Sequence, residues 1–182
     1  MTAATSRLQR EIRQTRPFAS PSAEAVVALL RTTDRLRRFL ARTVEPRGIT
    51  LQQYNVLRIL RGAGDDGLPT LEIAERMIEA APGVTRLLDR LEAKRLVRRE
   101  RCLRDRRQIL CWITPAGLGL VDALDEPMRR ADAAALQALS DARVAELLSL
   151  LDEVRAGLGA HDPSLPAEAG ATGTPFTQGE SR

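Results

Sequence analysis

The stretch that decides the fold is residues 82–117, PGVTRLLDRLEAKRLVRRERCLRDRRQILCWITPAG. Pro82 is expected to open a helix, because its missing N–H would have no intrahelical partner at the first helical position. The apolar side chains of this helix share one face: Val84, Leu87, Leu88 and Leu91. After Lys94 the apolar residues alternate instead, with one strand beginning at Val97 and the next carrying Ile109, Cys111 and Ile113. The stretch therefore predicts a helix followed by a β-hairpin with residues 104–107 at its tip.

Positive charge is concentrated in this stretch. Residues 82–107 contain ten Lys or Arg against four Asp or Glu, whereas the whole chain has a net charge of +4. A positive field on one face attracts and steers a polyanion, whereas evenly spread charge mainly maintains solubility. The pattern indicates nucleic acid as a partner, with a solvated Arg-rich surface as the alternative.

Length and composition favour one mainly α-helical domain with a helical extension. The 182 residues are 43% hydrophobic but only 3% aromatic, so Leu, Ala, Val and Ile have to fill the core. No stretch approaches the roughly 20 apolar residues that span a bilayer. The Arg-containing N-terminus also lacks the apolar run of a secretory signal. We expect a cytoplasmic protein with no membrane contact.

Side chains suited to metal or nucleophilic chemistry are scarce. Cys102 and Cys111 cannot form a disulfide framework or, with a single histidine, a metal site. That histidine, His161, lies in a stretch rich in Pro, Gly and Ala where nothing would orient it as a general base. We therefore expect no enzymatic activity, no metal and no cofactor.

Helical periodicity continues on both sides of the central stretch. Residues 1–19 form a basic arm, with arginines at a spacing of three: Arg7, Arg10, Arg13 and Arg16. The apolar spacing predicts a helix over residues 20–48. The domain that contains the central stretch is predicted to span residues 49–114. Within that domain Thr50 and Gln53 form a capping box, and Thr70 is expected to cap a short helix.

Residues 115–158 predict two more helices, one running to Leu139 with a bend or break at Pro127 and one beginning at Ser140-Asp141. Together with residues 20–48 they present more apolar surface than a small domain can bury. We therefore expect a second subunit to bury this surface in a dimer interface. From residue 159 to 182 Pro and Gly interrupt any periodicity, and this tail is expected to be disordered.

Four strings in this order make the chain resemble the MarR family of winged helix-turn-helix transcriptional regulators over roughly residues 25–155. They are Leu71-Glu72-Ile73-Ala74-Glu75-Arg76, Val84-Thr85-Arg86-Leu87-Leu88-Asp89-Arg90-Leu91-Glu92, Asp105-Arg106-Arg107 and Ile113-Thr114-Pro115-Ala116-Gly117. The resemblance implies a mainly α fold with a small β wing and terminal helices that interlock in a homodimer. It further implies binding to a palindromic operator in double-stranded DNA, usually as a repressor that a small-molecule effector or oxidation releases.

The resemblance also assigns residues. The DNA-binding set is Gly83, Thr85, Arg86 and Arg90 on the reading helix, and Arg104, Arg106 and Arg107 on the wing. Asp105 would hold a wing arginine in place, since phosphate repels a carboxylate. Candidates for a ligand pocket between the dimer helices and the winged domain are Phe39, Tyr54, Arg58 and Trp112.

Three positions depart from the family pattern. Residues 80–83 offer few side-chain hydrogen bonds to bases. Arg95 replaces the glycine usual at the end of the reading helix, so a left-handed turn there would be strained. Cys102 lies among arginines in the wing and is a candidate redox thiol. Two alternatives to a ligand-released repressor therefore remain: a redox-sensing regulator that uses Cys102, and a winged-helix protein-interaction module without specific DNA binding.

Leu110 and Trp112 fall on the strand face opposite Cys111, where polar residues would normally meet water. Exposed apolar side chains there need a cover. We expect the N-terminal arm to provide it through Leu8, Ile12 or Phe18.

Overall fold

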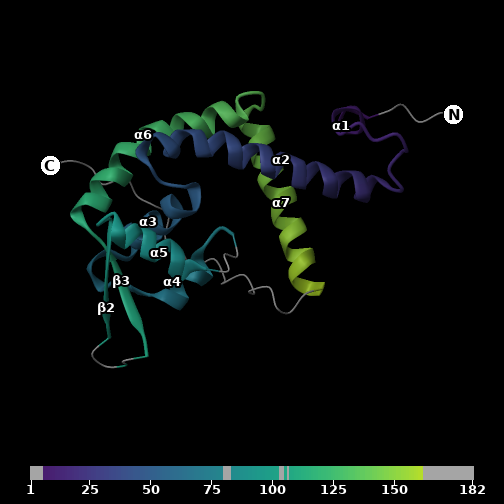
Figure 1. Ribbon diagram of the computed structural model, residues 1–182. Helices are drawn as coiled ribbons and strands as arrows, with labels where there is room; N and C mark the ends of the chain where they lie inside the picture. The colour runs from purple at the N-terminus through teal and green to yellow at the C-terminus, as the bar shows by residue number, and fades with distance from the viewer. Residues whose placement is uncertain (1–5, 80–82, 103–104, 106, 162–182) are drawn as a thin grey trace. The chain divides into compact units, whose positions relative to one another are not determined.

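The computed structural model describes residues 6–79, 83–102, 105 and 107–161 (Figure 1). Its helices are α1 (Arg7–Glu11), α2 (Pro21–Val44), α3 (Leu51–Ala63), α4 (Thr70–Arg76), α5 (Val84–Ala93), α6 (Pro115–Leu136) and α7 (Asp141–His161). Its strands are β1 (Leu68–Pro69), β2 (Val97–Arg101) and β3 (Ile109–Ile113), with short 3-10 turns at Glu45–Arg47 and Gly64–Asp66. The predicted class, mainly α with a small β wing, is confirmed. Residues 1–135 and 136–182 form two compact units.

The sheet is three-stranded and antiparallel in the order β1-β3-β2, with Val97 opposite Ile113 and Arg99 opposite Cys111. Sequence reasoning found β2 and β3 but missed β1, because two residues are too short to show an alternating pattern. In Figure 1 the β2–β3 hairpin, which we call the wing, extends away from helices α3–α5.

The core of the first unit lies between helices α3–α6 and the sheet. The predicted apolar face of α5 is buried, and its opposite face is exposed. The largest side chains that lose almost all contact with water come from every layer: Leu57, Leu60, Ile73, Leu88, Leu91, Val97, Cys111, Val121 and Leu124. Burial of apolar side chains of this size is the main favourable term that holds helix α5 and the wing together.

Side-chain caps define the starts of α2 and α3, and the capping box of α3 is the predicted one. The Ser20 hydroxyl accepts the Ala23 N–H at 3.1 Å, and Pro21 follows as the first residue of α2. Thr50 and Gln53 form the reciprocal capping box of α3, with bonds of 3.2 and 3.0 Å. Both caps satisfy backbone donors that have no intrahelical partner.

Two predicted helix starts were wrong. Helix α4 begins at Thr70 itself, with Pro69 in the N-cap position, and the Thr70 hydroxyl donates to the Ile109 carbonyl at 3.4 Å. Thr70 therefore links α4 to β3 instead of capping. Helix α5 begins at Val84 with Gly83 as its N-cap, two residues later than predicted, and Pro82 lies outside the described residues.

Helix α6 is continuous through Pro127 and ends at Leu136. Of the two outcomes expected at Pro127, a bend or a break, the break is therefore wrong. Buried Val121, Leu124 and Met128 attach it to the core of the first unit. Arg61 of α3 adds a two-pronged ion pair to Asp125 of α6, at 2.7 and 3.1 Å. Packing and this ion pair hold α6 along its length, which compensates for the hydrogen bond that proline removes.

Helix α7 reaches His161, so it extends into residues assigned to the tail, and residues 162–182 lie outside the described part of the chain. Apolar side chains on α2 and α7 stay exposed: Val26, Leu29, Leu30 and Leu36, and Leu148, Leu150, Val154 and Leu158. None of the helices described here has the length and apolar character needed to cross a membrane.

Candidate nucleic-acid interface

Helix α5 presents a polar face to solvent, and Arg86 and Arg90 give one side of that face a positive charge. Gly83, at φ +118°, starts the helix in a conformation that residues with a Cβ rarely adopt. Thr85, Arg86 and Arg90 are exposed, because the apolar residues between them face the core. Arg86 and Arg90 stand one helical turn apart on the same side of α5. Within the described part of the chain neither guanidinium has an ion-pair partner, so both are available to a ligand.

The wing turn is organised by Asp105. Its Oδ1 accepts the backbone N–H of Arg107 at 3.0 Å, its Oδ2 accepts the side-chain amide of Gln108 at 3.2 Å, and its carbonyl accepts the Gln108 N–H at 3.0 Å. Among the described residues Asp105 therefore holds the backbone amide of Arg107 and the side-chain amide of Gln108, and its predicted hold on a wing arginine side chain stays a prediction. Short polar side chains often satisfy turn amides in this way. The side chains of Arg104 and Arg106 lie outside the described residues.

A cleft of about 510 Å³ lies between α4, the start of α5 and the wing. Thr85 of α5 and Arg107 of the wing both line it, together with Thr70 and Leu71 of α4 and Ile109 of β3. Gly83, at the start of α5, lines it too, so the fold brings three predicted DNA-binding residues to one concave face, although more than twenty positions separate Arg107 from the other two.

The turn between α4 and α5 is tied to two other helices. The Glu79 carboxylate forms an ion pair with Arg37 of α2 at 2.7 Å and accepts a hydrogen bond from the side-chain amide of Gln52 of α3 at 3.3 Å. The Ile78 N–H donates to Asn55 of α3 at 3.0 Å. Sequence reasoning missed this cluster, because its members come from three segments and no local pattern connects them.

Helix α5 ends at a strained residue. Arg95 has φ +58°, so the chain leaves α5 through the left-handed turn that is strained for a residue with a Cβ. Its N–H donates to the Glu92 carbonyl at 2.8 Å, and its own carbonyl accepts the Thr114 hydroxyl at 2.7 Å. Thr114 also caps α6 by accepting the Gly117 N–H at 3.1 Å. These bonds fix the conformation that directs the chain from α5 into the wing.

The prediction that the N-terminal arm covers Trp112 was wrong. The Arg98 guanidinium stacks 4.1 Å from the centroid of the indole, and the indole N–H donates to the Asp65 carbonyl at 3.0 Å. Gly67 lies so close that an added Cβ would be 2.5 Å from the ring. Neighbours on the adjacent strand and turn thus cover the indole, since an arginine extends its apolar stem and planar head over an aromatic face.

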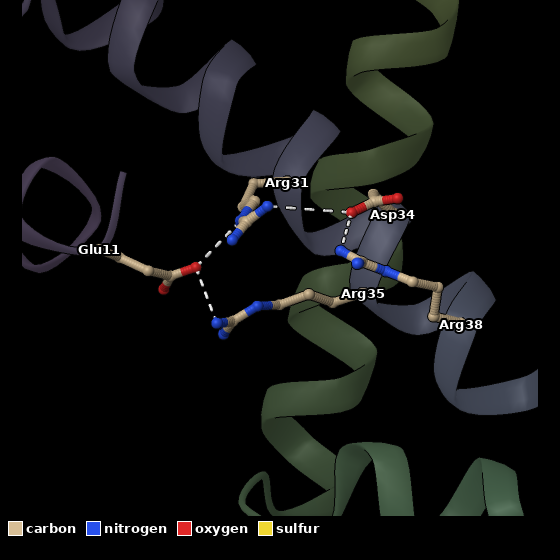
Figure 2. A network of polar contacts seen from close by, with 5 residues as sticks. All are labelled: Glu11, Arg31, Asp34, Arg35 and Arg38. Carbon is tan, nitrogen blue, oxygen red and sulfur yellow. Dashed lines mark hydrogen bonds and ion pairs between the residues drawn. The ribbon is translucent and has the colours of Figure 1, made fainter. Parts of the chain in front are cut away.

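The arm instead contacts α2 (Figure 2). Glu11 of α1 accepts Arg31 at 3.1 Å and Arg35 at 3.0 Å, and Asp34 continues the network to Arg38. One carboxylate thus binds two arginines from successive turns of α2. The contact described between the arm and α2 is therefore made by the arm's acidic residue.

The four candidate pocket residues have different ring contacts. Tyr54 is 4% exposed and has Arg58 6.0 Å from its ring centroid; burial raises the pKa of its phenol. Phe39 instead pairs with Arg42, 5.8 Å from its ring, and Trp112 belongs to the wing cluster described above. The ring contacts described thus join Tyr54 and Arg58, and the four-residue ligand pocket stays a prediction.

The two cysteines differ in environment. Cys111 is fully buried beside Thr70, and burial raises the pKa of its thiol. Cys102 is half-buried just after β2, where its backbone N–H donates to Gln108 at 3.0 Å. Redox sensing by Cys102 stays a prediction. Among the residues described, no three acidic, cysteine or histidine side chains gather in a way that would hold a metal ion.

Comparisons with known proteins agree on one family. A model described as the MarR family matches residues 47–108, which hold α3–α5 and most of the wing. The chain is 27% identical over 101 residues to the HTH-type transcriptional regulator MhqR of Bacillus subtilis strain 168, covering 56% of this chain and 68% of MhqR.

Solved structures lead to the same result. The structure of BpsR from Bordetella bronchiseptica, 22% identical, has the same fold with a TM-score of 0.66 over 72% of this chain and 98% of BpsR. A MarR transcription factor from Planctomyces limnophilus is 38% identical with a TM-score of 0.59, over 75% of this chain and 98% of that one. The chain described here therefore belongs to the MarR family of winged helix transcriptional regulators.

Proposed function

We propose that this regulator is a homodimeric repressor that binds a palindromic operator and leaves it when a small ligand binds. The observation that carries the proposal is the pair Arg86 and Arg90, exposed on α5 and without an ion-pair partner among the described residues. The start of the same helix lines a cleft together with Arg107 of the wing. A helix that buries one face and presents arginines on the other is suited to the major groove, and a basic wing is suited to the neighbouring phosphates.

The two arginine positions have different tasks in this proposal. Arg86, in the first turn of α5, reads a guanine through a two-pronged hydrogen bond to its major-groove edge. Arg107 binds backbone phosphate, and Asp105 fixes the turn that presents it. A contact with a base gives sequence preference, whereas a contact with phosphate strengthens binding to every sequence.

Two further parts of the proposal have separate support. The exposed apolar side chains of α2 and α7 favour a second copy as their cover, since isolated chains rarely leave so many large apolar residues in water. For ligand release, the solved relative BpsR is a protein whose DNA binding is regulated by 6-hydroxynicotinic acid. A small aromatic acid is thus a reasonable first class of effector to test.

Selection from random duplex DNA tests the proposal, with the purified protein at a fixed, stated salt concentration. The wild type should enrich a palindrome, and Arg86→Ala should lose preference at one base position per half-site, at a cost of about 1–3 kcal/mol. Arg107→Ala should weaken binding to selected and random DNA alike. Arg129→Ala, on the exposed surface of α6, is the matched control that should change neither.

Recovery of unselected sequences by the wild type would refute the proposal and favour the protein-interaction module. Equal losses on operator and random DNA for Arg86→Ala would refute the assigned role of Arg86 alone.

A further inference from the structure

Arg99, in the middle of β2, reaches across to α5 and binds two of its carboxylates. Its Nη2 lies 2.7 Å from Asp89 Oδ1 and 2.6 Å from Glu92 Oε2, and its Nε donates to the same Glu92 oxygen at 3.0 Å. The Arg99 side chain is only 18% exposed. The hydrogen bond with Glu92 raises the pKa of the guanidinium, which therefore remains charged.

The two carboxylates lie on α5, the proposed recognition helix. Asp89 and Glu92 are 54% and 40% exposed, and Asp89 stands between Arg86 and Arg90 in the sequence of α5. An uncompensated carboxylate at this place would repel DNA phosphates and weaken the positive field of both arginines. Arg99 supplies the compensating charge from the wing.

The contact of Arg99 with the two carboxylates also fixes the orientation of β2 relative to α5. A guanidinium is planar and donates in fixed directions, so binding two carboxylates one turn apart determines how β2 crosses α5. The wing continues from β2 to the turn that contains Asp105 and Arg107. The ion pair thus links the orientation of the phosphate-binding wing to that of the base-reading helix.

We propose that Arg99 is a positioning residue for sequence recognition: it sets the angle between the wing and α5 and neutralises Asp89 and Glu92, without touching DNA. The inference rests on the proposed function, because it concerns how the same interface discriminates between sequences. Arg99 carries no signal in the sequence that separates it from its basic neighbours.

The test measures affinity for the selected operator and for a random duplex of equal length, across a series of salt concentrations. Arg99→Lys keeps the charge but cannot bind both carboxylates in the same way, so operator affinity should fall about tenfold while random-DNA affinity stays near the wild-type value. Arg99→Gln also leaves both carboxylates uncompensated, so affinity for both duplexes should fall.

A triple variant separates charge from geometry. Arg99→Gln combined with Asp89→Asn and Glu92→Gln removes the two carboxylate charges, but it does not restore the contact between β2 and α5. Its random-DNA affinity should return at least to the wild-type value, while its preference for the operator stays lost. Arg101→Gln, two residues further along β2 and exposed, removes the same charge and should keep the operator preference.

Three results would overturn the inference. Operator affinity of Arg99→Lys and Arg99→Gln equal to wild type would show that the clamp has no role in recognition. A triple variant that stays weak on random DNA, with a salt slope lower by about 0.9, would show that Arg99 contacts phosphate directly. Loss of preference in Arg101→Gln equal to that in Arg99→Lys would show a general charge effect. A wild type that selects no palindrome would instead refute the proposed function, so the two failures are distinguishable.

Discussion

Replacing Arg95 by glycine should stabilise this protein, because Arg95 has φ +58° where the chain leaves the reading helix. A residue with a Cβ costs roughly 1–2 kcal/mol in the left-handed region. Glycine avoids this cost but gives the unfolded chain extra freedom worth about 0.5–1 kcal/mol. The net gain in the free energy of unfolding should therefore be about 0.5–1 kcal/mol, in favour of glycine.

The side chain of Arg95 is exposed, whereas its backbone makes the specific bonds. Its N–H donates to Glu92 and its carbonyl accepts Thr114, and glycine can make both. Arg95→Ala is therefore the matched control: it removes the same side chain but keeps the Cβ. The difference between the glycine and alanine variants isolates the backbone conformation.

Thermal unfolding followed by circular dichroism, at one fixed protein concentration, measures the effect. A gain of about 0.5–1 kcal/mol corresponds to roughly 1–4 °C in Tm for a chain of this size. The concentration has to be fixed, because the association of subunits makes Tm depend on it. A glycine variant no more stable than the alanine variant would refute the idea that this turn stores strain.

Three further changes have defined outcomes. Gly67→Ala should shift Trp112 fluorescence to longer wavelength and lower Tm, because the new Cβ would collide with the indole; an unchanged spectrum would contradict the packing described. A thiol reagent at neutral pH should label Cys102 well before Cys111, because Cys111 is buried and its pKa is raised; the reverse order would be inconsistent with the structure. Glu79→Gln weakens the attachment of the turn to α2 and α3, so it should reduce operator affinity several-fold with little change in Tm, as expected for partly exposed ion pairs worth about 0–1 kcal/mol. Titration of operator DNA with the variant and the wild type checks this, and equal affinities would show that the turn needs no such attachment.

The local parts of the fold were predictable because their signals lie within one turn of the chain. The capping box of Thr50 and Gln53 is one example, and the start of α2 at Pro21 is another. Where prediction failed, a distant contact had overridden a local preference. Thr70 turns its hydroxyl to the Ile109 carbonyl instead of capping α4. Helix α6 stays continuous at Pro127, where buried Leu124 and Met128 on either side attach it to the core.

The candidate site shows the same division. The exposed arginines Arg86 and Arg90 follow from the helical period, since the apolar stripe has to face the core. The partners of Trp112 and Glu11 cannot be derived from the helical period, because the sequence offers many other charged and apolar residues of similar type as partners. Only their positions in space select Arg98 for the indole and two arginines of α2 for the carboxylate.

The sequence by itself determined which segments are helical, where the wing is and which face of α5 is basic, because hydrophobic periodicity and turn chemistry are local properties. Only the tertiary structure decided that Arg99 joins Asp89 and Glu92, that Glu79 ties its turn to α2 and α3, and that Thr85 and Arg107 share a cleft. In a chain with 28 basic and 24 acidic residues, any basic side chain could chemically pair with any acidic one, so the sequence does not say which pairs form. The packed core sets which of these charges come within a few ångströms of each other, and so it selects the pairs that form.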